Sequence, residues 1–409
     1  MITRAQAAFV FIFITVLLDM ISFGVIIPVF PQLILQLQGG DMAGAAAIFG
    51  IFGTAFALMQ FVFSPVQGAL SDRYGRRPVV LLSNLGLGID YVVMAVAPTL
   101  SILFLGRLLS GATSASFSIS GAYVADVTPP EKRAARFGLL GVAFGIGFIV
   151  GPAIGGFLGA IDLRAPFWAS AALSFTNFLY GLFILPESLP VERRSPFHLR
   201  AANPIGAMRF LGSRQVLFSL ALVAFFANLA HDSLPNTFVL YSTARFAFDE
   251  RAIGLSLAIV GASSLVVQGL LVGRTVAAIG EYRALLAGLS IGTVAQLLLG
   301  LAPTTALFLL GLPIWSFFGL TGASLQAIAT REVAPNEQGQ LQGALSSLRS
   351  IVTLVTPVLY TGTFALFVGP LASLGLPGAP FILSAGLLTV AIALQLTALR
   401  RAPAAFSPS

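Results

Sequence analysis

One loop of this sequence carries most of the information on its fold: Gly68-Ala69-Leu70-Ser71-Asp72-Arg73-Tyr74-Gly75-Arg76-Arg77-Pro78. Long apolar runs at 46–70 and 78–97 flank it, and its glycines permit a tight reversal between two helices. Asp72 can neutralise neighbouring guanidinium groups, and the arginines can pair with Asp126 further along the chain. A loop that only anchors positive charge would explain the arginines but not the Gly–Asp–Gly spacing. The loop therefore predicts a defined set of polar contacts.

Composition places the whole chain in a membrane. Of its 409 residues, 57% are hydrophobic and 9% charged, with a mean hydropathy of +0.95, whereas soluble domains carry about 25% charged residues. A transmembrane helix needs about 20 apolar residues, and the apolar runs lack the alternation of barrel strands. We expect an all-α polytopic membrane protein with twelve helices, at 5–36, 46–70, 78–97, 101–126, 133–159, 163–186, 214–242, 251–274, 283–302, 306–331, 340–368 and 375–400.

The distribution of positive charge predicts the orientation in the membrane. Of 22 Lys and Arg residues, Arg107 and Arg349 lie inside predicted spans, and only Arg164, Arg245 and Arg251 fall on one side. The other 17 share the side of both termini, which is therefore predicted to be cytoplasmic. The basic balance is explained by contact with the lipid bilayer, and nucleic acid is not expected as a partner. We expect a multi-pass protein of the bacterial inner membrane.

An internal repeat divides the chain near its midpoint. The matches, at offsets of 205 or 206, are Gly68 and Gly75 with Gly273 and Gly280, and Asp126-Val127, Pro129 and Glu131 with Glu332-Val333, Pro335 and Glu337. Parallel six-helix repeats around a site near the bilayer midplane are typical of transporters. We predict an N-terminal bundle at 1–186, a cytoplasmic central loop at 187–213, and a C-terminal bundle with a short tail at 214–409.

At the Gly68–Pro78 loop the sequence resembles the major facilitator superfamily. Gly106-Arg107 resembles the buried-arginine motif of the family, and 141–156 resembles the helix 5 motif of drug/proton antiporters. Four further segments most resemble the tetracycline-efflux group: Asp90-Tyr91, 121–128, 186–188 and 339–343. The resemblance implies two pseudo-symmetric six-helix bundles and a cytoplasmic gating motif made of Gly68, Asp72, Arg73, Gly75, Arg76, Arg77 and Asp126. It also implies a drug/proton antiporter motif in the fifth helix, made of Gly147, Gly151, Pro152, Gly155 and Gly156. The same glycines allow close helix packing in any case.

Charged residues inside predicted spans are the candidates for proton and substrate coupling, because an ionisable group in hydrocarbon is costly unless it is paired or faces a cavity. These candidates are Asp19, Asp90, Arg107, His231 and Asp232. Asp19 and Asp90 match acidic positions of the tetracycline-efflux pattern, and Arg107 is a partner for either. The alternatives are a static ion pair for Asp90 with Arg107, and a wetted outer helix end for His231 and Asp232. Tetracycline pumps carry a histidine in helix 8 and an acid in helix 9, where this chain has Ser264 and Gly292.

These features together predict a proton-coupled secondary transporter, an antiporter that exports hydrophobic or amphipathic small molecules, tetracycline-like ones included. The alternatives are a proton-coupled uptake symporter of a small metabolite on the same fold, and a non-transporting membrane receptor. No phosphate-binding loop, cysteine or histidine cluster is present, so we expect no enzyme activity, nucleotide, metal or cofactor beyond the proton gradient. A functional monomer is expected, its cavity lined by polar residues that include Gln60, Tyr123, Gln268, Gln296 and Gln326.

Overall fold

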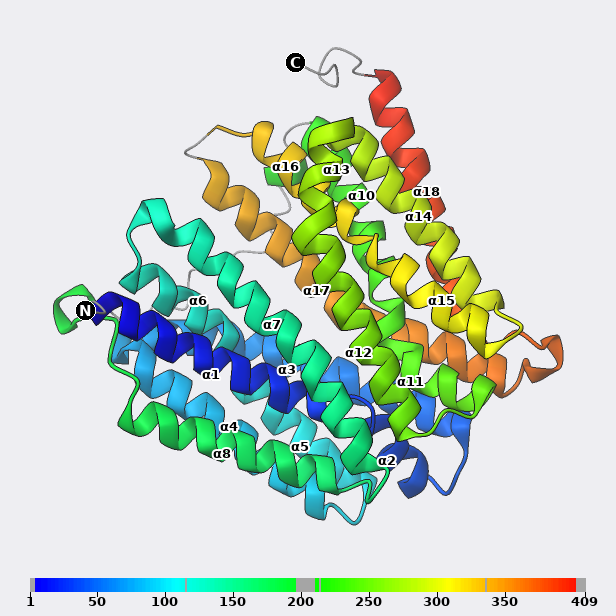
Figure 1. The fold of residues 1–409 in the computed structure, drawn as a ribbon, viewed down its shortest axis with the longest axis horizontal. Coiled ribbons are helices and arrows are strands. Elements are labelled where there is room, and N and C mark those ends of the chain that lie inside the picture. Colours follow the sequence, from blue (N-terminus) through cyan, green and yellow to red (C-terminus); the bar gives the residue numbers. More distant parts are fainter. Residues whose placement is uncertain (1–3, 115, 196–209, 213–214, 335–336, 402–409) are drawn as a thin grey trace. The chain divides into compact units, whose positions relative to one another are not determined.

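Every regular element of the described chain is a helix (Figure 1). The computed structural model describes residues 4–114, 116–195, 210–212, 215–334 and 337–401. In hydrocarbon every backbone N–H and C=O must be satisfied within its own segment, so long apolar runs become helices. The predicted all-α polytopic fold is confirmed. The described chain divides into two compact units, which are treated separately below.

The first unit comprises Met1–Asp41, Ile51–Ala202 and Phe248–Gly261. Within it, α1 packs against α7 and α8, and α4 packs against α5, α6 and α8. The elements of the N-terminal half are α1 (Arg4–Ile26), α2 (Phe30–Leu37), α3 (Met42–Tyr74), α4 (Arg76–Val96), α5 (Leu100–Thr113), α6 (Ser116–Val127), α7 (Pro130–Gly159), α8 (Ala165–Phe183) and the 3-10 turn η1 (Val191–Arg193).

The second unit comprises Met42–Gly50, Asn203–Ala247 and Ala262–Ser409. Its central helices α10 and α14 both pack against α18, while α17 packs against α10 and α11. The elements of the C-terminal half are α10 (Gln215–His231), α11 (Ser233–Phe246), α12 (Glu250–Val266), the π-helical turn η3 (Val267–Leu271), α13 (Val272–Ile279), α14 (Glu281–Leu301), α15 (Thr305–Ser316), α16 (Gly319–Arg331), α17 (Gln338–Val368), the 3-10 turn η5 (Ala372–Leu374) and α18 (Ala379–Arg401). Of the predicted central loop, 196–209 and 213–214 lie outside the described residues, as does the tail from 402.

Ten helical stretches of the described chain are long and apolar enough to cross a membrane, against the twelve spans predicted. The span predicted at 101–126 is interrupted after Thr113, so that α5 and α6 share its length. The span predicted at 163–186 appears as α8, whose Trp168, serines and Asn177 lower its hydropathy. Both segments are helical where helices were expected. They are not among the ten stretches because of their length and polarity.

The internal repeat recurs in backbone geometry. Gly75 precedes α4 with a φ of 106° and Gly280 precedes α14 with a φ of 79°, and both have a ψ of 161°. Thr99 caps α5 and Thr304 caps α15, each by accepting a hydrogen bond from the backbone N–H three residues ahead. All four positions obey the 205-residue offset. The two halves therefore share the same helix starts, including a positive φ that favours glycine.

Candidate functional site

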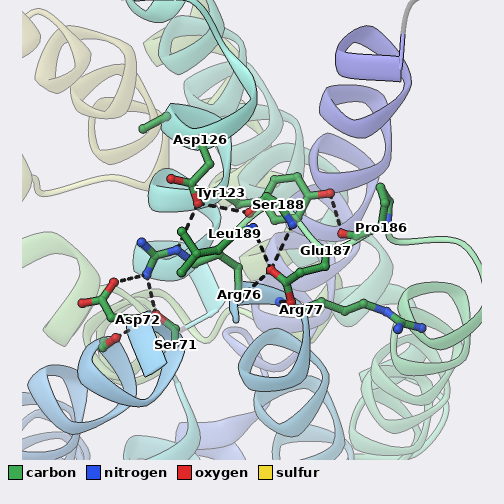
Figure 2. A network of polar contacts seen from close by, with 12 residues as sticks. Ser71, Asp72, Arg76, Arg77, Tyr123, Asp126, Pro186, Glu187, Ser188 and Leu189 are labelled. Carbon is green, nitrogen blue, oxygen red and sulfur yellow. Dashed lines mark hydrogen bonds and ion pairs between the residues drawn. The ribbon is translucent and has the colours of Figure 1, made fainter. Parts of the chain in front are cut away.

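Arg76 is the centre of the contacts around the Gly68–Pro78 loop (Figure 2). Its guanidinium lies 2.5 Å from Asp72 Oδ1 and 3.1 Å from Asp126 Oδ2, and it donates a hydrogen bond of 2.7 Å to Ser71 Oγ. Asp126 also accepts from Ser188 Oγ at 3.1 Å. Arg76 thus makes the contact predicted for the arginines of the loop. We call Asp72, Arg76 and Asp126 the latch.

Glu187, just after α8, holds the start of α4. Its carboxylate accepts hydrogen bonds from the backbone N–H groups of Arg76 at 2.9 Å and Arg77 at 3.2 Å, a favourable place for negative charge because the N-terminus of a helix is partially positive. A Cβ atom on Gly75 would collide with Glu187 Oε2. Residues 186–188 contributed to the resemblance, but no role was predicted for Glu187. An acidic residue after a span was its only sequence signal, and nothing in it points to a loop 111 residues away.

The C-terminal half carries the same contact with its charges exchanged. Arg331 lies 2.7 Å from Glu281, and these positions follow Asp126 and Arg76 by 205 residues. The sequence comparison had instead aligned Asp126 with Glu332, at an offset of 206. Arg331 is 69% exposed, whereas Arg76 is 12% exposed. The second contact is therefore the more solvated of the two, and weaker for that reason.

The predicted antiporter motif lies in α7, where its glycines bring three helices together. A Cβ atom on Gly151 would lie 2.6 Å from Gly24 Cα in α1, and one on Gly147 would collide with Met20. Gly155 meets the Val25 carbonyl. Further along, a Cβ atom on Gly156 would lie 3.0 Å from Gly254 Cα in α12, and Pro152 lies within α7 among these glycines. Close packing is thus a role that these glycines fulfil.

Gly151→Ala is expected to destabilise the protein by about 1–3 kcal/mol, because the added methyl group meets backbone rather than a movable side chain. Gly141 in the same helix is a matched control, since a Cβ atom there has no neighbour within 4 Å. Gly141→Ala should leave stability unchanged or raise it slightly. Thermal unfolding in detergent measures both variants, and equal midpoints for the two would contradict this packing role.

Two buried acids lie in the first unit. Asp19 of α1 accepts a hydrogen bond of 2.8 Å from Asn177 Nδ2 of α8. Asp90 of α4 is 0% exposed, and the Ser110 hydroxyl and the Arg107 guanidinium of α5 act on its carboxylate. A Cβ atom on Gly106 would lie 2.8 Å from Asp90 Oδ1. The Gly106-Arg107 motif therefore leaves room for this carboxylate.

Arg107 of α5 is the cation that acts on Asp90. It is 6% exposed, and its guanidinium lies over two aromatic rings, 4.5 Å from the centre of Phe56 and 5.1 Å from that of Phe30. Such contacts stabilise a desolvated cation. Arg107 and Asp90 thus form a buried charge pair, in which Arg107 also contacts two aromatic rings.

In the second unit, Asp232 pairs with a residue of α17. Its Oδ1 lies 2.7 Å from Arg349 and its Oδ2 accepts from Thr356 Oγ1 at 3.1 Å. Asp232 is 4% exposed and is the eighteenth residue of the 32-residue stretch Gln215–Phe246. It thus lies near the middle of that helical stretch, at the junction of α10 and α11. His231 beside it is stacked on Trp315 at 4.8 Å and on Phe318 at 5.4 Å.

The positions that are titratable in tetracycline pumps hold no charge here. Ser264 Oγ donates a hydrogen bond of 3.2 Å to Ser316 Oγ. A Cβ atom on Gly292 would lie 2.7 Å from the ring of Phe318. The second unit therefore leaves no room for an acid at 292, and its described mid-span charges lie on α10 and α17 instead.

The residues predicted to line a cavity have different surroundings. Tyr123 donates to the Pro186 carbonyl at 2.8 Å and belongs to the contacts around the latch. Gln60 donates to the Ser114 carbonyl, and buried Gln296 donates to Ser233 Oγ. Gln268 and Gln326 are exposed, and Gln268 lies in the π-helical turn η3, an element often found at functional sites.

Long helices with charges buried at mid-span, in two repeats that share their loop geometry, define a polytopic membrane transport protein. The chain belongs to the Major Facilitator Superfamily, whose family model matches residues 12–357. The relatives and structural neighbours below are transport or resistance proteins by name, and the chain is a transporter rather than an enzyme.

Three comparisons define its relations within that family. The chain is 38% identical to the tetracycline resistance protein, class C, of Escherichia coli, over 88% of this chain and 91% of that protein. Among solved structures, the human organic anion transporter MFSD10 is 25% identical with a TM-score of 0.70, covering 96% of this chain and all of that one. A bacterial homologue of the human lysosomal transporter Spinster, 16% identical, shares the fold with a TM-score of 0.78 over the full length of both.

Proposed function

We propose that this transporter is a proton-coupled antiporter that exports hydrophobic or amphipathic small molecules by alternating access, with proton exchange at Asp19 and Asp90. The observation that carries the proposal is the Asp90 carboxylate, which is fully buried at mid-helix with Arg107 as its cation. A charged carboxylate in this position is costly. Protonation removes that cost, so a cycle of proton uptake and release is the natural use of such a group.

The relatives support export. Tetracycline resistance proteins of classes C, E and G are 35–38% identical to this chain, and tetracycline is therefore one candidate substrate. Ser264 and Gly292 remove two titratable groups of the tetracycline pattern. We infer that the second unit uses other residues for coupling, with His231 and Asp232 as the candidates.

The latch is proposed to stabilise one conformation of the transport cycle. Arg76 joins the loop after α3 to Asp126 at the end of α6, so breaking this contact would free both segments to move. The protein is proposed to act as a monomer in the bacterial inner membrane with both termini cytoplasmic. The proton gradient is its energy source, without a metal, nucleotide or other cofactor.

The proposal is tested in inverted membrane vesicles by recording proton movement. A respiration-driven pH gradient is established, and tetracycline, cationic dyes and acidic dyes are added in turn. At least one compound should release protons in wild-type vesicles. Asp19→Asn should abolish that release, because an amide cannot exchange a proton at this position.

Two outcomes contradict the antiport proposal. Proton release that persists at wild-type rate in Asp19→Asn and in Asp90→Asn would remove both acids from the coupling step. Compound entry together with protons in right-side-out vesicles would identify uptake symport instead. Thr330→Ser, which keeps the hydroxyl of a partly exposed residue of α16, serves as the control.

A further inference from the structure

Only one member of the ion pair of Asp232 and Arg349, the arginine, is accessible from outside the pair. The side chain of Asp232 is 6% exposed, whereas the side chain of Arg349 is 43% exposed. The bonds of Arg349 run inward, from Nη2 to Asp232 Oδ1 at 2.7 Å and from Nη1 to Asn228 Oδ1 at 3.4 Å. A guanidinium has five N–H donors in a fixed planar arrangement, so these two bonds leave donors for a further partner.

The depth of Arg349 in α17 shows what surrounds its exposed side. The helix runs from Gln338 to Val368, so its middle is residue 353 and Arg349 lies four residues, about 6 Å, from that middle. An arginine at this depth is costly in hydrocarbon. The charged end of Arg349 must therefore face water rather than lipid.

Asp232 itself is closed to a ligand. Its two oxygens are held by Arg349 and Thr356, and it lies where α10 gives way to α11. Carbonyls at that break are also bonded, Leu229 by Tyr360 Oη at 2.7 Å and Ala230 by Ser384 Oγ at 2.8 Å. A cationic molecule would have to displace Arg349 before it met this carboxylate. The charge that a ligand meets first is positive.

We propose that Arg349 binds the acidic group of the transported molecule, a carboxylate or a sulfonate, through the N–H donors that its bonds to Asp232 and Asn228 leave. This proposal rests on the proposed transport function and assigns its substrate class: amphipathic organic anions. The planar guanidinium matches the geometry of such groups through two parallel hydrogen bonds.

Two dyes with the same planar xanthene ring test the substrate class. Sulforhodamine B carries sulfonate groups, while rhodamine 6G carries only a positive charge. Their binding to the purified full-length transporter is measured by fluorescence anisotropy at one fixed pH. We expect sulforhodamine B to bind at least tenfold more tightly than rhodamine 6G. R349Q should weaken sulforhodamine B binding at least tenfold.

R349Q leaves Asp232 without its partner, so its folding is checked by thermal unfolding, and R349Q/D232N removes both charges at once. The double variant should fold and still bind sulforhodamine B at least tenfold more weakly than wild type. Wild-type affinity in the double variant would overturn the proposal, as would absent sulforhodamine B binding or a preference for rhodamine 6G in the wild-type protein. Failure of the antiport proposal can be told apart from failure of this one. In that case the dye still binds, but the vesicles show no proton release.

Discussion

Arg76→Ala is expected to lower transport at least tenfold while leaving the amount of protein in the membrane unchanged. The substitution removes the contacts to Asp72, Asp126 and Ser71 together, and the latch has no other cation between its two acids. The conformation that the latch stabilises then becomes less populated, and the transport cycle slows. Initial rates in inverted vesicles measure the effect, and immunoblots of the same vesicles measure insertion.

Arg331→Ala is the matched control, because Arg331 makes the equivalent contact in the C-terminal half. Exposed ion pairs contribute about 0–1 kcal/mol, and Arg331 is 69% exposed. Its loss should change transport less than twofold. Equal losses in the two variants would show that the latch has no special part in the cycle, and an Arg76→Ala protein that fails to insert would assign Arg76 to folding instead.

Hydropathy alone predicted most of the helices, because a backbone in lipid has few alternatives to a helix. Two predicted spans are not long and apolar enough to cross a membrane as single helices. The span at 101–126 is interrupted after Thr113, and the span at 163–186 contains polar residues; a count of apolar residues registers neither feature. The loop glycines also carried information on the backbone. Gly75 and Gly280, which the repeat relates, both have a positive φ.

Apart from the pairing of the loop arginines with Asp126, side-chain partners far apart in the chain could not be predicted from the sequence. Glu187 binds the start of α4, 111 residues away, and Arg349 pairs with Asp232, 117 residues away. Nothing local specifies either contact, since each depends on which helices become neighbours. The repeat was of no help, because the mid-span charges of the two halves lie at positions that are not equivalent: Asp19, Asp90 and Arg107 in one, Asp232 and Arg349 in the other.

Arg107→Gln is expected to destabilise the first unit by about 3–5 kcal/mol, since removing one member of a buried charge pair leaves the other uncompensated. Contacts of the guanidinium with Phe30 and Phe56 are lost as well. Thermal unfolding in detergent measures the destabilisation. It should diminish as the pH falls, because a protonated Asp90 no longer needs a positive partner.

The double variant Asp90→Asn/Arg107→Gln separates stability from transport. With both charges removed, at least half of the lost stability should return, while proton-coupled transport remains absent because neither charge is left to exchange or balance a proton. A static ion pair that only fixes the helix register predicts otherwise: the double variant would recover transport together with stability. Destabilisation by Arg107→Gln that is the same at every pH would likewise mean that Asp90 carries no charge in the resting protein, and that Arg107 contributes only through its aromatic contacts.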